Sequence, residues 1–393
     1  MAKHIGVFVT GGIAAYKVPL LVRALIKQGN EVRVAMTPAA ANFVTPQTLA
    51  TVSKAAVLTD AAEFAAPEHV AHVALAHWMD QAIVVPATAN TIAKLAFGLA
   101  DNVVTTTLLA FAGQKLLVPA MNDQMWQNAQ TQANIRHLQA AGWQVLPPAT
   151  GFLAEGYAGV GRMPEPDAIA LFSALAPQQA YLAGQKIVIT AGGTRERIDP
   201  VRYLTNDSSG KMGTALANAA AAAGAEVELI TTAQQLTLPQ VKVTAVQTAS
   251  EMATAVQSRF EAADIVLMAA AVADYRPAAP ADHKLKKQGA AGLTIDLVQN
   301  PDILAQLGNA KTHQFVVGFA AETNDLLANA QTKLTKKHAD LLIANPVGSG
   351  LGFNADNNTV TLLWPNAAPE PLPTASKIAL AQTIWQKIAQ VRA

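Results

Sequence analysis

Short runs of apolar residues recur along the chain, and longer segments with helical patterning separate them. In the first half, these runs predict strands at Ile5–Val9, Glu31–Met36, Ala82–Pro86, Lys115–Val118 and Gln144–Leu146. In the second half, they predict strands at Lys186–Thr190, Glu226–Thr231, Val241–Val246, Asp264–Ala269, Phe315–Gly318 and Leu341–Ala344. Strands that alternate with helices form βαβ units, so we expect an α/β protein with two doubly wound parallel sheets, Rossmann-like or flavodoxin-like.

The boundary between two domains is expected near residue 180. A helix predicted at Pro164–Leu175 closes the first half, and the segment Ala176–Gln179 follows it. The second half begins a new alternation, with helices expected at Lys211–Ala223, Ser250–Ala262, Asn324–Lys337 and Ala375–Val391 and an edge strand at Thr359–Trp364. A chain of 393 residues is long for one hydrophobic core. We therefore predict domains at 1–180 and 181–393.

The amino-acid composition argues against several classes of protein function. Hydrophobic residues make up 51% of the chain, charged residues 14%, and the net charge is +1. This balance argues against disorder and against a nucleic-acid binder, which would be strongly basic. No apolar run approaches the roughly 20 residues that a membrane span needs. The chain has no cysteine, which excludes disulfides, thiolate metal sites and a cysteine nucleophile. Since the start has no signal-peptide pattern, we expect a cytoplasmic protein without membrane or nucleic-acid partners.

Two glycine-containing turns follow the strand at Lys186–Thr190. The first is Gly192-Gly193-Thr194, and the second is Ser208-Ser209-Gly210-Lys211-Met212-Gly213 at the start of a predicted helix. Backbone N–H groups at such turns, together with the helix dipole, can bind phosphate. Between the turns lie Arg195, Arg197, Asp199, Arg202 and Asn206. This density of charge predicts a ligand site; the alternative is a polar loop over a helix N-terminus.

The stretch GGTRERIDPVRYLTNDSSGKMG resembles the signature of phosphopantothenate–cysteine ligases. Further motifs continue the resemblance in order at Ala269–Arg276, His283–Lys287, Asn300–Leu304, Val317–Thr323 and Phe353–Asn357. The resemblance implies that CTP is a co-substrate with Mg²⁺, and that Asn206 and Lys284 are catalytic. It also implies nucleotide contacts from Asp274, Lys284, Pro301, Asp302, Ile303, Leu304, Phe319, Lys333 and Lys337.

The implied ligation accounts for these side chains. A carboxylate that attacks the α-phosphate of CTP approaches a triphosphate of its own sign. Lysines and magnesium offset the repulsion and stabilise the leaving pyrophosphate. The amine of cysteine then attacks the acyl-cytidylate, a step for which the neutral amide of Asn206 is suited. Charge does not distinguish CTP from ATP, so the choice of CTP depends on the resemblance.

Polar residues of the first half come directly after its predicted strands. Gly11-Gly12-Ile13, Thr37, Pro86–Thr91 and Pro119–Asn122 all occupy such positions, where the carboxyl ends of a parallel sheet bind ligands. The Gly-Gly turn does not fit the dinucleotide fingerprint and is a weak signal by itself. His69, His72 and His77 precede a strand, and their spacing does not select a general base among them.

Taken together, Val9–Lys17, His72–Asp80, Pro86–Thr91 and Pro119–Trp126 resemble the flavin-dependent cysteine decarboxylases. The resemblance implies that His72 and Asn122 are catalytic. It implies FMN bound by Gly11, Gly12, Ile13, Thr37, Phe43, Thr88, Ala89, Asn90, Thr91 and Ala120, and substrate bound by Met125, Arg162 and Met163. A flavin gives the cysteinyl carboxylate the electron sink that it lacks, while the protein orients the substrate and transfers protons.

A glycine-rich flap is predicted at Gly151–Met163. The decarboxylase family usually has Ala-Cys-Gly here, and that cysteine is the proton donor of the reductive step. This chain has Ala154-Glu155-Gly156, although the following Gly161-Arg162-Met163 matches. Either Glu155 donates the proton, with a pKa raised when the flap closes over it, or this half-reaction is impaired.

We therefore expect a bifunctional enzyme of coenzyme A biosynthesis that ligates 4′-phosphopantothenate to cysteine and decarboxylates the product to 4′-phosphopantetheine. The alternatives are a flavin-binding regulatory subunit and a ligase whose decarboxylase domain is impaired. Flavin sites of this family lie where subunits meet, so the resemblance implies a homo-oligomer. Trimeric decarboxylase domains and dimeric ligase domains are expected, which together would form a dodecamer.

Overall fold

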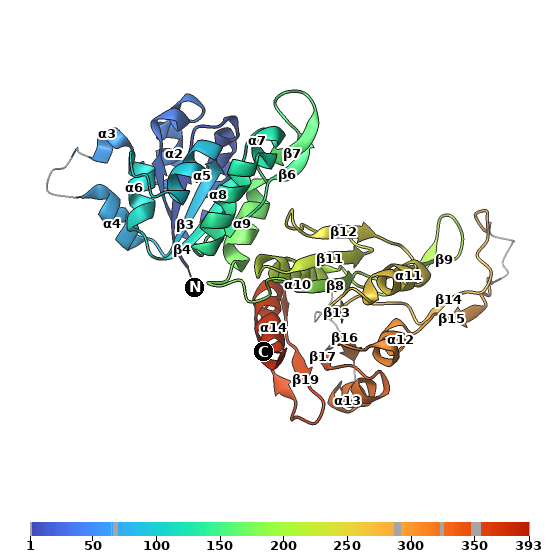
Figure 1. The fold of residues 1–393 in the computed structure, drawn as a ribbon. Helices are drawn as coiled ribbons and strands as arrows, with labels where there is room; N and C mark the ends of the chain where they lie inside the picture. The colour runs from blue at the N-terminus through green and yellow to red at the C-terminus, as the bar shows by residue number, and fades with distance from the viewer. Residues whose placement is uncertain are drawn as a thin grey trace. The chain divides into compact units, whose positions relative to one another are not determined.

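The structure is a computed structural model that describes residues 2–63, 65, 70–286, 292–322, 326–346 and 355–392. The chain divides into two compact units, Met1–Gln179 and Ala180–Ala393, which we call unit 1 and unit 2. Each unit is a layered α/β fold around a largely parallel sheet (Figure 1). The predicted fold class is therefore confirmed.

The main sheet of unit 1 is parallel throughout, with the strand order β2-β1-β3-β4-β5. Its strands are β1 (His4–Val9), β2 (Glu31–Met36), β3 (Gln81–Ala87), β4 (Gln114–Pro119) and β5 (Gln144–Val145). This is the flavodoxin-like order, in which ligands bind at the carboxyl ends of the strands beside the switch point between β1 and β3. An antiparallel hairpin, β6 (Ala149–Phe152) and β7 (Ala158–Arg162), follows the sheet.

The helices of unit 1 cover both faces of this sheet. They are η1 (Ile13–Lys17), α1 (Val18–Lys27), η2 (Pro38–Asn42), α2 (Pro46–Ser53), α3 (Asp60–Glu63), α4 (Ala71–Trp78), α5 (Ala89–Ala96), α6 (Val103–Ala110), α7 (Asp123–Gln127), α8 (Ala129–Ala140) and α9 (Pro166–Leu175). The helical segment after the Gly11-Gly12 turn is divided into η1 and α1. Pro19 suits the first turn of α1, where a missing N–H loses no hydrogen bond.

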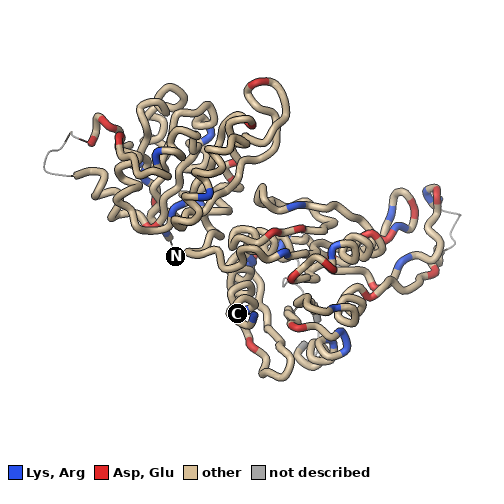
Figure 2. Tube along the Cα trace, in the orientation of Figure 1, with Lys and Arg blue, Asp and Glu red and all other residues tan. Residues whose placement is uncertain are grey.

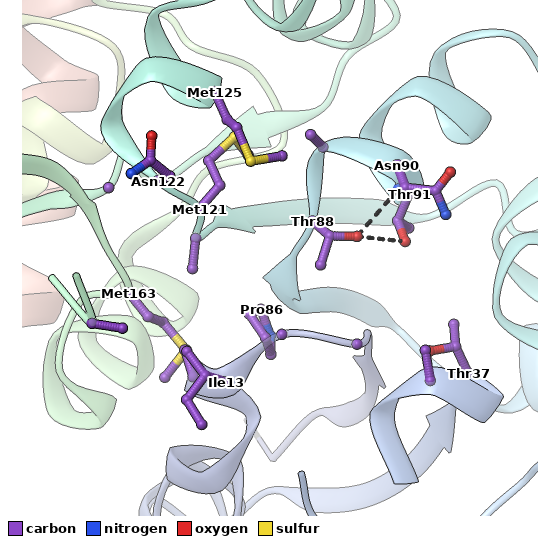
Figure 3. Close-up of a pocket in the computed structure, with 18 of the residues that line it drawn as sticks. Ile13, Thr37, Pro86, Thr88, Asn90, Thr91, Met121, Asn122, Met125 and Met163 are labelled. Atoms are coloured by element: carbon purple, nitrogen blue, oxygen red, sulfur yellow. Dashed lines mark hydrogen bonds between the residues drawn. The ribbon is translucent and has the colours of Figure 1, made fainter. Parts of the chain in front are cut away.

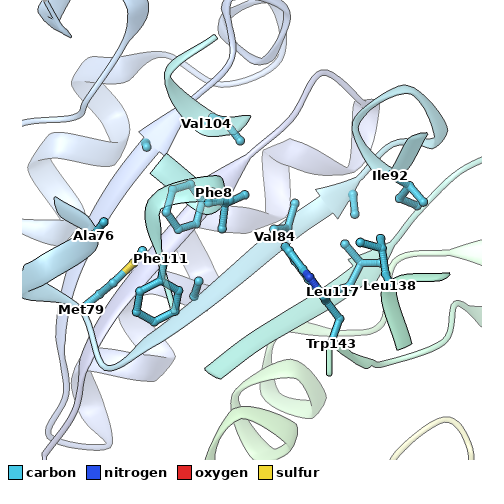
Figure 4. Packing of buried hydrophobic residues seen from close by; sticks show 14 of the residues in the cluster. Phe8, Ala76, Met79, Val84, Ile92, Val104, Phe111, Leu117, Leu138 and Trp143 are labelled. Atoms are coloured by element: carbon cyan, nitrogen blue, oxygen red, sulfur yellow. The ribbon is translucent and has the colours of Figure 1, made fainter. Parts of the chain in front are cut away.

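One face of the sheet in unit 1 carries a continuous apolar core (Figure 4). Phe8, Val84 and Leu117 lie on neighbouring strands, and all three are fully buried. They pack with side chains from the covering helices, among them Ile92 of α5 and Val104 of α6. Burial of this surface fixes the sheet, and the sheet in turn sets the spacing of the loops at its carboxyl edge.

The sheet of unit 2 has the strand order β12-β11-β8-β13-β16-β17-β19-β20. The strands are β8 (Lys186–Ala191), β11 (Glu226–Thr231), β12 (Lys242–Ala245), β13 (Ile265–Met268), β16 (Phe315–Glu322), β17 (Leu341–Pro346), β19 (Thr361–Leu363) and β20 (Glu370–Pro371). The parallel strands follow the Rossmann order, with the switch point between β8 and β13. The predicted edge strand is β19, but the prediction of an edge position is wrong because β20 pairs with its outer side.

The helices of unit 2 are α10 (Lys211–Ala222), α11 (Ala249–Phe260), α12 (Ile303–Ala310), α13 (Leu326–Lys336) and α14 (Lys377–Arg392). The sequence pattern did not predict α12 or the short pairings β9 (Arg195–Arg197) with β10 (Tyr203–Thr205) and β14 (Tyr275–Pro277) with β15 (Leu297–Gln299). The last helix begins at Lys377, later than expected, because β21 (Ala375–Ser376) pairs with β18 (Asn357–Asn358). Asn324, where α13 was expected to begin, lies outside the described residues.

Lysines and arginines are interspersed with acidic residues in both units (Figure 2). Among the described residues, neither unit has an extended surface of one charge, so a group of cations that lines a cavity is a local feature. None of the described helices combines the length and the apolar character that a bilayer span requires.

Candidate functional site

Unit 1 contains a cavity of about 960 Å³ at the carboxyl ends of its strands, beside the switch point; we call it cavity 1. Figure 3 shows side chains from separate loops around it. The residues expected to bind cofactor that line it are Gly11, Gly12, Ile13, Thr37, Thr88, Ala89, Asn90, Thr91 and Ala120. Phe43, at the end of η2, lies outside the lining. The loops singled out in the sequence thus converge on one space.

The first turn of α5 lies at cavity 1 and is suited to bind an anion. Thr88 caps the helix, since its hydroxyl oxygen accepts a hydrogen bond from the N–H of Thr91 at 3.3 Å. The N–H groups and the dipole at such a helix start favour a phosphate. The hydroxyl oxygen of Thr37 is buried in the lining and has no hydrogen-bond partner among the described residues. A ligand in the cavity can satisfy it.

Apolar side chains complete the wall of cavity 1. Ile13, Met121 and Met163 line it (Figure 3). At Gly11 a Cβ would lie 2.5 Å from the Cβ of Ala39, so glycine is required for the close approach of this turn to η2. An apolar wall combined with a phosphate-binding helix start fits a flat aromatic cofactor that carries a phosphate, such as FMN.

The flap is the β6–β7 hairpin, and hydrogen bonds hold its tip to the loop after β4. The amide nitrogen of Asn122 donates to Oε1 of Glu155 at 2.9 Å and to the hydroxyl of Tyr157 at 2.9 Å. Tyr157 donates in turn to Oδ1 of Asp123 at 2.6 Å. This last bond raises the pKa of Tyr157 and lowers the pKa of Asp123. Glu155 and Asn122 both line cavity 1, so the flap brings the two predicted catalytic groups into contact.

The base of the flap fits closely against the same loop. A Cβ at Gly161 would lie 2.0 Å from the carbonyl oxygen of Met121, and the N–H of Met121 donates to the carbonyl of Gly161 at 3.0 Å. Next to it, Arg162 and Lys17 both pair with Glu165 at 2.8 Å. The Lys17 ammonium is the main reason why the pKa of Glu165 lies below its usual range. Arg162, Met163 and Met125, the predicted substrate contacts, all line cavity 1.

His72 lies in α4 and outside the lining of cavity 1. Its Nδ1 lies 2.5 Å from Oε1 of Glu63, and its backbone N–H donates to Oε2 of the same carboxylate at 3.1 Å. Glu63 thus fixes the orientation of the imidazole ring. His69 lies outside the described residues, as do Lys287, Thr323, Phe353 and Asn354 of the ligase motifs. Asn122 lines cavity 1 and His72 does not, so the two predicted catalytic residues do not share a cavity within one chain.

Unit 2 contains a cavity of about 820 Å³ at the carboxyl ends of β13 and β16, here called cavity 2. The predicted nucleotide contacts and catalytic residues in its lining are Asn206, Asp274, Pro301, Asp302, Ile303, Leu304, Phe319, Lys333 and Lys337. Lys284 is exposed and lies outside the lining. The predicted nucleotide contacts, although separated in sequence, converge as expected apart from this lysine.

Glycines allow the loop of Asn206 to lie against the end of β8. A Cβ at Gly193 would lie 2.5 Å from the carbonyl oxygen of Asn206. The amide of Asn206 donates to the carbonyl oxygens of Val272 at 3.1 Å and Ala271 at 3.4 Å. Gly210 then takes a φ of 73° as the N-cap of α10, so that the first turn of this helix faces the cavity.

Cations of cavity 2 come from several elements. Lys333 lies in the last turn of α13, Lys337 directly follows that helix, and Lys337 pairs with Asp302. The lining also includes Lys211, which belongs to the glycine turn predicted at Ser208–Gly213, and Asn345, Asn358 and Lys377, which sequence reasoning did not place in the site. No recognised motif surrounds Lys377. Among the described residues, no group of three or more histidine, aspartate or glutamate side chains is arranged to hold a metal ion.

Asp199 and Arg202 anchor the segment that carries Lys284. Oδ2 of the buried Asp199 accepts from the N–H of Leu285 at 3.1 Å, and Arg202 donates to the carbonyl oxygen of Leu285 at 2.8 Å. Arg202 also pairs with Asp199, and this hydrogen bond is the main cause of the strongly lowered pKa of Asp199. The ionised carboxylate thus fixes the residue next to Lys284.

We predict that Asp199→Asn releases this segment, because an amide loses the charge-assisted hydrogen bonds to Arg202 and Leu285. Trypsin cleavage at Lys284 and Lys286 should accelerate about tenfold or more, whereas Asp282→Asn, an exposed carboxyl of the same segment, should leave it unchanged. The folded pKa of Asp199 is lowered, so its contribution is complete at neutral pH and is lost only below the ordinary carboxyl range. Equal cleavage of both variants would contradict the anchor.

Two family models match the chain. Residues 182–391 match the DNA/pantothenate metabolism flavoprotein C-terminal domain, and residues 1–174 match the flavoprotein family. The coenzyme A biosynthesis bifunctional protein CoaBC of Bacillus subtilis is 43% identical over 393 residues, which cover 98% of this chain and 97% of that protein. The Escherichia coli protein of the same name is 44% identical over 396 residues, with 98% and 96% covered. A crystal structure of the C-terminal domain of a CoaBC protein covers 54% of this chain and 98% of its own, at 36% identity and a TM-score of 0.47.

Proposed function

The chain belongs to the family of coenzyme A biosynthesis bifunctional proteins, which have ligase and decarboxylase activities, and from this we propose substrates and roles for its two cavities. Cavity 2 joins 4′-phosphopantothenate to cysteine at the expense of CTP, and cavity 1 decarboxylates the product to 4′-phosphopantetheine. The identity over nearly the whole chain carries this proposal, and the convergence of each motif set on its own cavity supports it. A role in coenzyme A biosynthesis agrees with the cytoplasmic location expected from the sequence.

Cavity 1 would hold FMN. The first turn of α5 and Thr37 would bind its phosphate end, and Ile13, Met121 and Ala120 would contact the ring system. When bound, the flavin supplies the electron sink for loss of carbon dioxide from the cysteinyl carboxylate. The amide of Asn122 binds that carboxylate without adding repulsive charge, and Glu155 lies beside it as the proton donor.

The position of His72 supports a flavin site shared between subunits. Its ring is held by Glu63 and half-buried, yet it lies outside the cavity of its own chain. A general base must come within hydrogen-bond reach of the group that it deprotonates. We propose that His72 reaches cavity 1 of a neighbouring copy in a trimer, and that the ligase units dimerise separately.

Complementation tests the shared site. His72→Asn and Asn122→Ala should each lower decarboxylation at least about a hundredfold. Co-expressed chains of the two variants should regain about a quarter of wild-type activity, because a quarter of the sites in randomly mixed rings pair an intact His72 with an intact Asn122. Variants purified separately and mixed without exchange are the control. No recovery in co-expressed assemblies would mean that both residues act within one chain.

In cavity 2, Lys333, Lys337 and the turn at Ser208–Gly213 would bind the triphosphate. Magnesium would enter with the nucleotide, since this ion usually binds through substrate phosphates and one or two carboxylates. Asp207 and Asp274 line the cavity and would bind the ion, whereas the lining carboxylate of Asp302 pairs with Lys337. Lys284 would act from its anchored segment at the edge of the cavity.

Incubation with 4′-phosphopantothenate, cysteine, CTP and Mg²⁺ tests both activities, with the products identified by mass spectrometry. Phosphopantetheine is expected, and omission of CTP or of Mg²⁺ should abolish it. Phosphopantothenoylcysteine as the only product would favour the alternative of a ligase with an impaired decarboxylase, for which Glu155 in place of a cysteine is the motivating observation. If neither phosphopantothenoylcysteine nor phosphopantetheine forms, the proposed ligation is wrong.

A further inference from the structure

Cavity 2 contains a buried lysine that the proposed reaction has not yet used. Lys377 is the first residue of α14, and 6% of its surface is exposed. It lines the cavity together with Asn358, and the pairing of β18 with β21 brings these late residues to the glycine turn at Ser208–Gly213. α14 also packs on α10, whose first turn belongs to that glycine turn.

The charges around Lys377 are unfavourable for a cation. Burial lowers the pKa of Lys377, and the ammonium of Lys211 lowers it further, while Asp356 opposes both effects. Asp356 pairs with Lys211 at 2.7 Å, but 90% of the Asp356 side chain is exposed. Lys377 and Lys211 thus place two ammonium groups at this end of cavity 2, beside a carboxylate that lies largely in solvent.

Three described carboxylates line cavity 2, those of Asp207, Asp274 and Asp302, and Asp302 pairs with Lys337. A buried cation beside a second cation costs free energy unless an anion joins them. Backbone N–H groups at the start of α10 face the same place, so a group with several anionic oxygens satisfies both requirements.

We propose that Lys377 binds the polyphosphate of the nucleotide at the Ser208–Gly213 turn, together with Lys211, and that it holds the departing pyrophosphate there. This inference rests on the proposed function, namely that cavity 2 takes CTP. It adds a phosphate contact from the C-terminal helix to those from α13. Lys211 can exchange Asp356 for the phosphate, because that carboxylate lies in solvent.

Lys377→Met keeps the length of the side chain and removes its charge. Affinity for CTP and for inorganic pyrophosphate, measured by calorimetry on the full-length protein, should fall about ten- to a hundredfold. The KM for cysteine and the melting temperature of the free protein should remain close to wild type, since a buried cation is not needed for packing. Lys377→Arg retains the charge and should recover most of the affinity. Lys387→Met, on the same helix but paired with Glu370 and outside the cavity lining, is the matched control.

The outcomes separate this inference from the proposed function. If the wild-type protein does not bind CTP, the proposed use of cavity 2 is wrong. If the wild-type protein binds CTP and Lys377→Met binds it equally well, Lys377 is not a phosphate contact. A Lys377→Met protein that fails to fold, or that weakens the binding of cysteine and CTP alike, gives Lys377 a structural role and also overturns the inference.

Discussion

Asn206→Asp is expected to form the acyl-cytidylate and then to accumulate it. The amide of Asn206 lies in cavity 2 and donates to the carbonyl oxygens of Ala271 and Val272. A carboxylate cannot donate these bonds, and it would repel both carbonyls and the oxygens of the mixed anhydride. The attacking amine is then misplaced, so ligation should slow by about a hundred- to a thousandfold while CTP is still consumed. Trapping the cytidylate by rapid quench and mass spectrometry measures this block.

Lys284→Gln is expected to act one step earlier. Without this charge, the carboxylate of phosphopantothenate meets the triphosphate with less neutralisation, so little acyl-cytidylate should form. Lys286→Gln removes an exposed lysine two positions away and serves as the matched control. Since the anchor at Asp199 holds Leu285, Asp199→Asn should resemble a weaker form of Lys284→Gln. If Asn206→Asp and Lys284→Gln stall at the same step, the proposed division of roles is wrong.

The residues that sequence reasoning placed well share one property. Gly11, Thr88 and Asn122 each follow a strand of a parallel sheet, and the order of such strands carries their loops to a common edge. In unit 2, Asn206 and Asp274 lie in the longer connections that leave the carboxyl ends of β8 and β13. Local apolar runs were sufficient to find the strands, and the strands were sufficient to bring these loops together.

The positions that sequence reasoning missed depend on contacts between distant segments. Lys377 reaches cavity 2 because β21 pairs with β18, which no local pattern indicates. Lys284 lies outside the cavity lining, on a segment whose Leu285 is held by the distant Asp199 and Arg202. For His72, the expectation of a catalytic role came from a motif, and a motif does not say in which chain a side chain acts. The sequence around a single histidine or lysine does not show which residues surround that side chain in the folded protein.

Glu155 and Tyr157 are the two candidates for the final proton in cavity 1, and the hydrogen bonds distinguish them. Tyr157 donates its proton to Asp123, which raises the pKa of the phenol and makes it a poorer acid. Glu155 accepts from Asn122, the residue proposed to bind the substrate carboxylate, so its own proton can face the substrate.

We therefore predict that Glu155→Gln still decarboxylates the substrate but fails in the final protonation. Glutamine retains the oxygen that accepts from Asn122, so the flap should stay in place while the acidic proton is lost. Net formation of phosphopantetheine should fall about a hundredfold or more, and an unsaturated thiol, lighter by a pair of hydrogen atoms, should accumulate instead. Product mass and flavin absorbance in a single turnover are the measurements, and Tyr157→Phe, which should retain near-normal turnover, is the control. Full turnover by Glu155→Gln together with a block in Tyr157→Phe would assign the proton to the tyrosine and leave Glu155 as a surface residue of the flap.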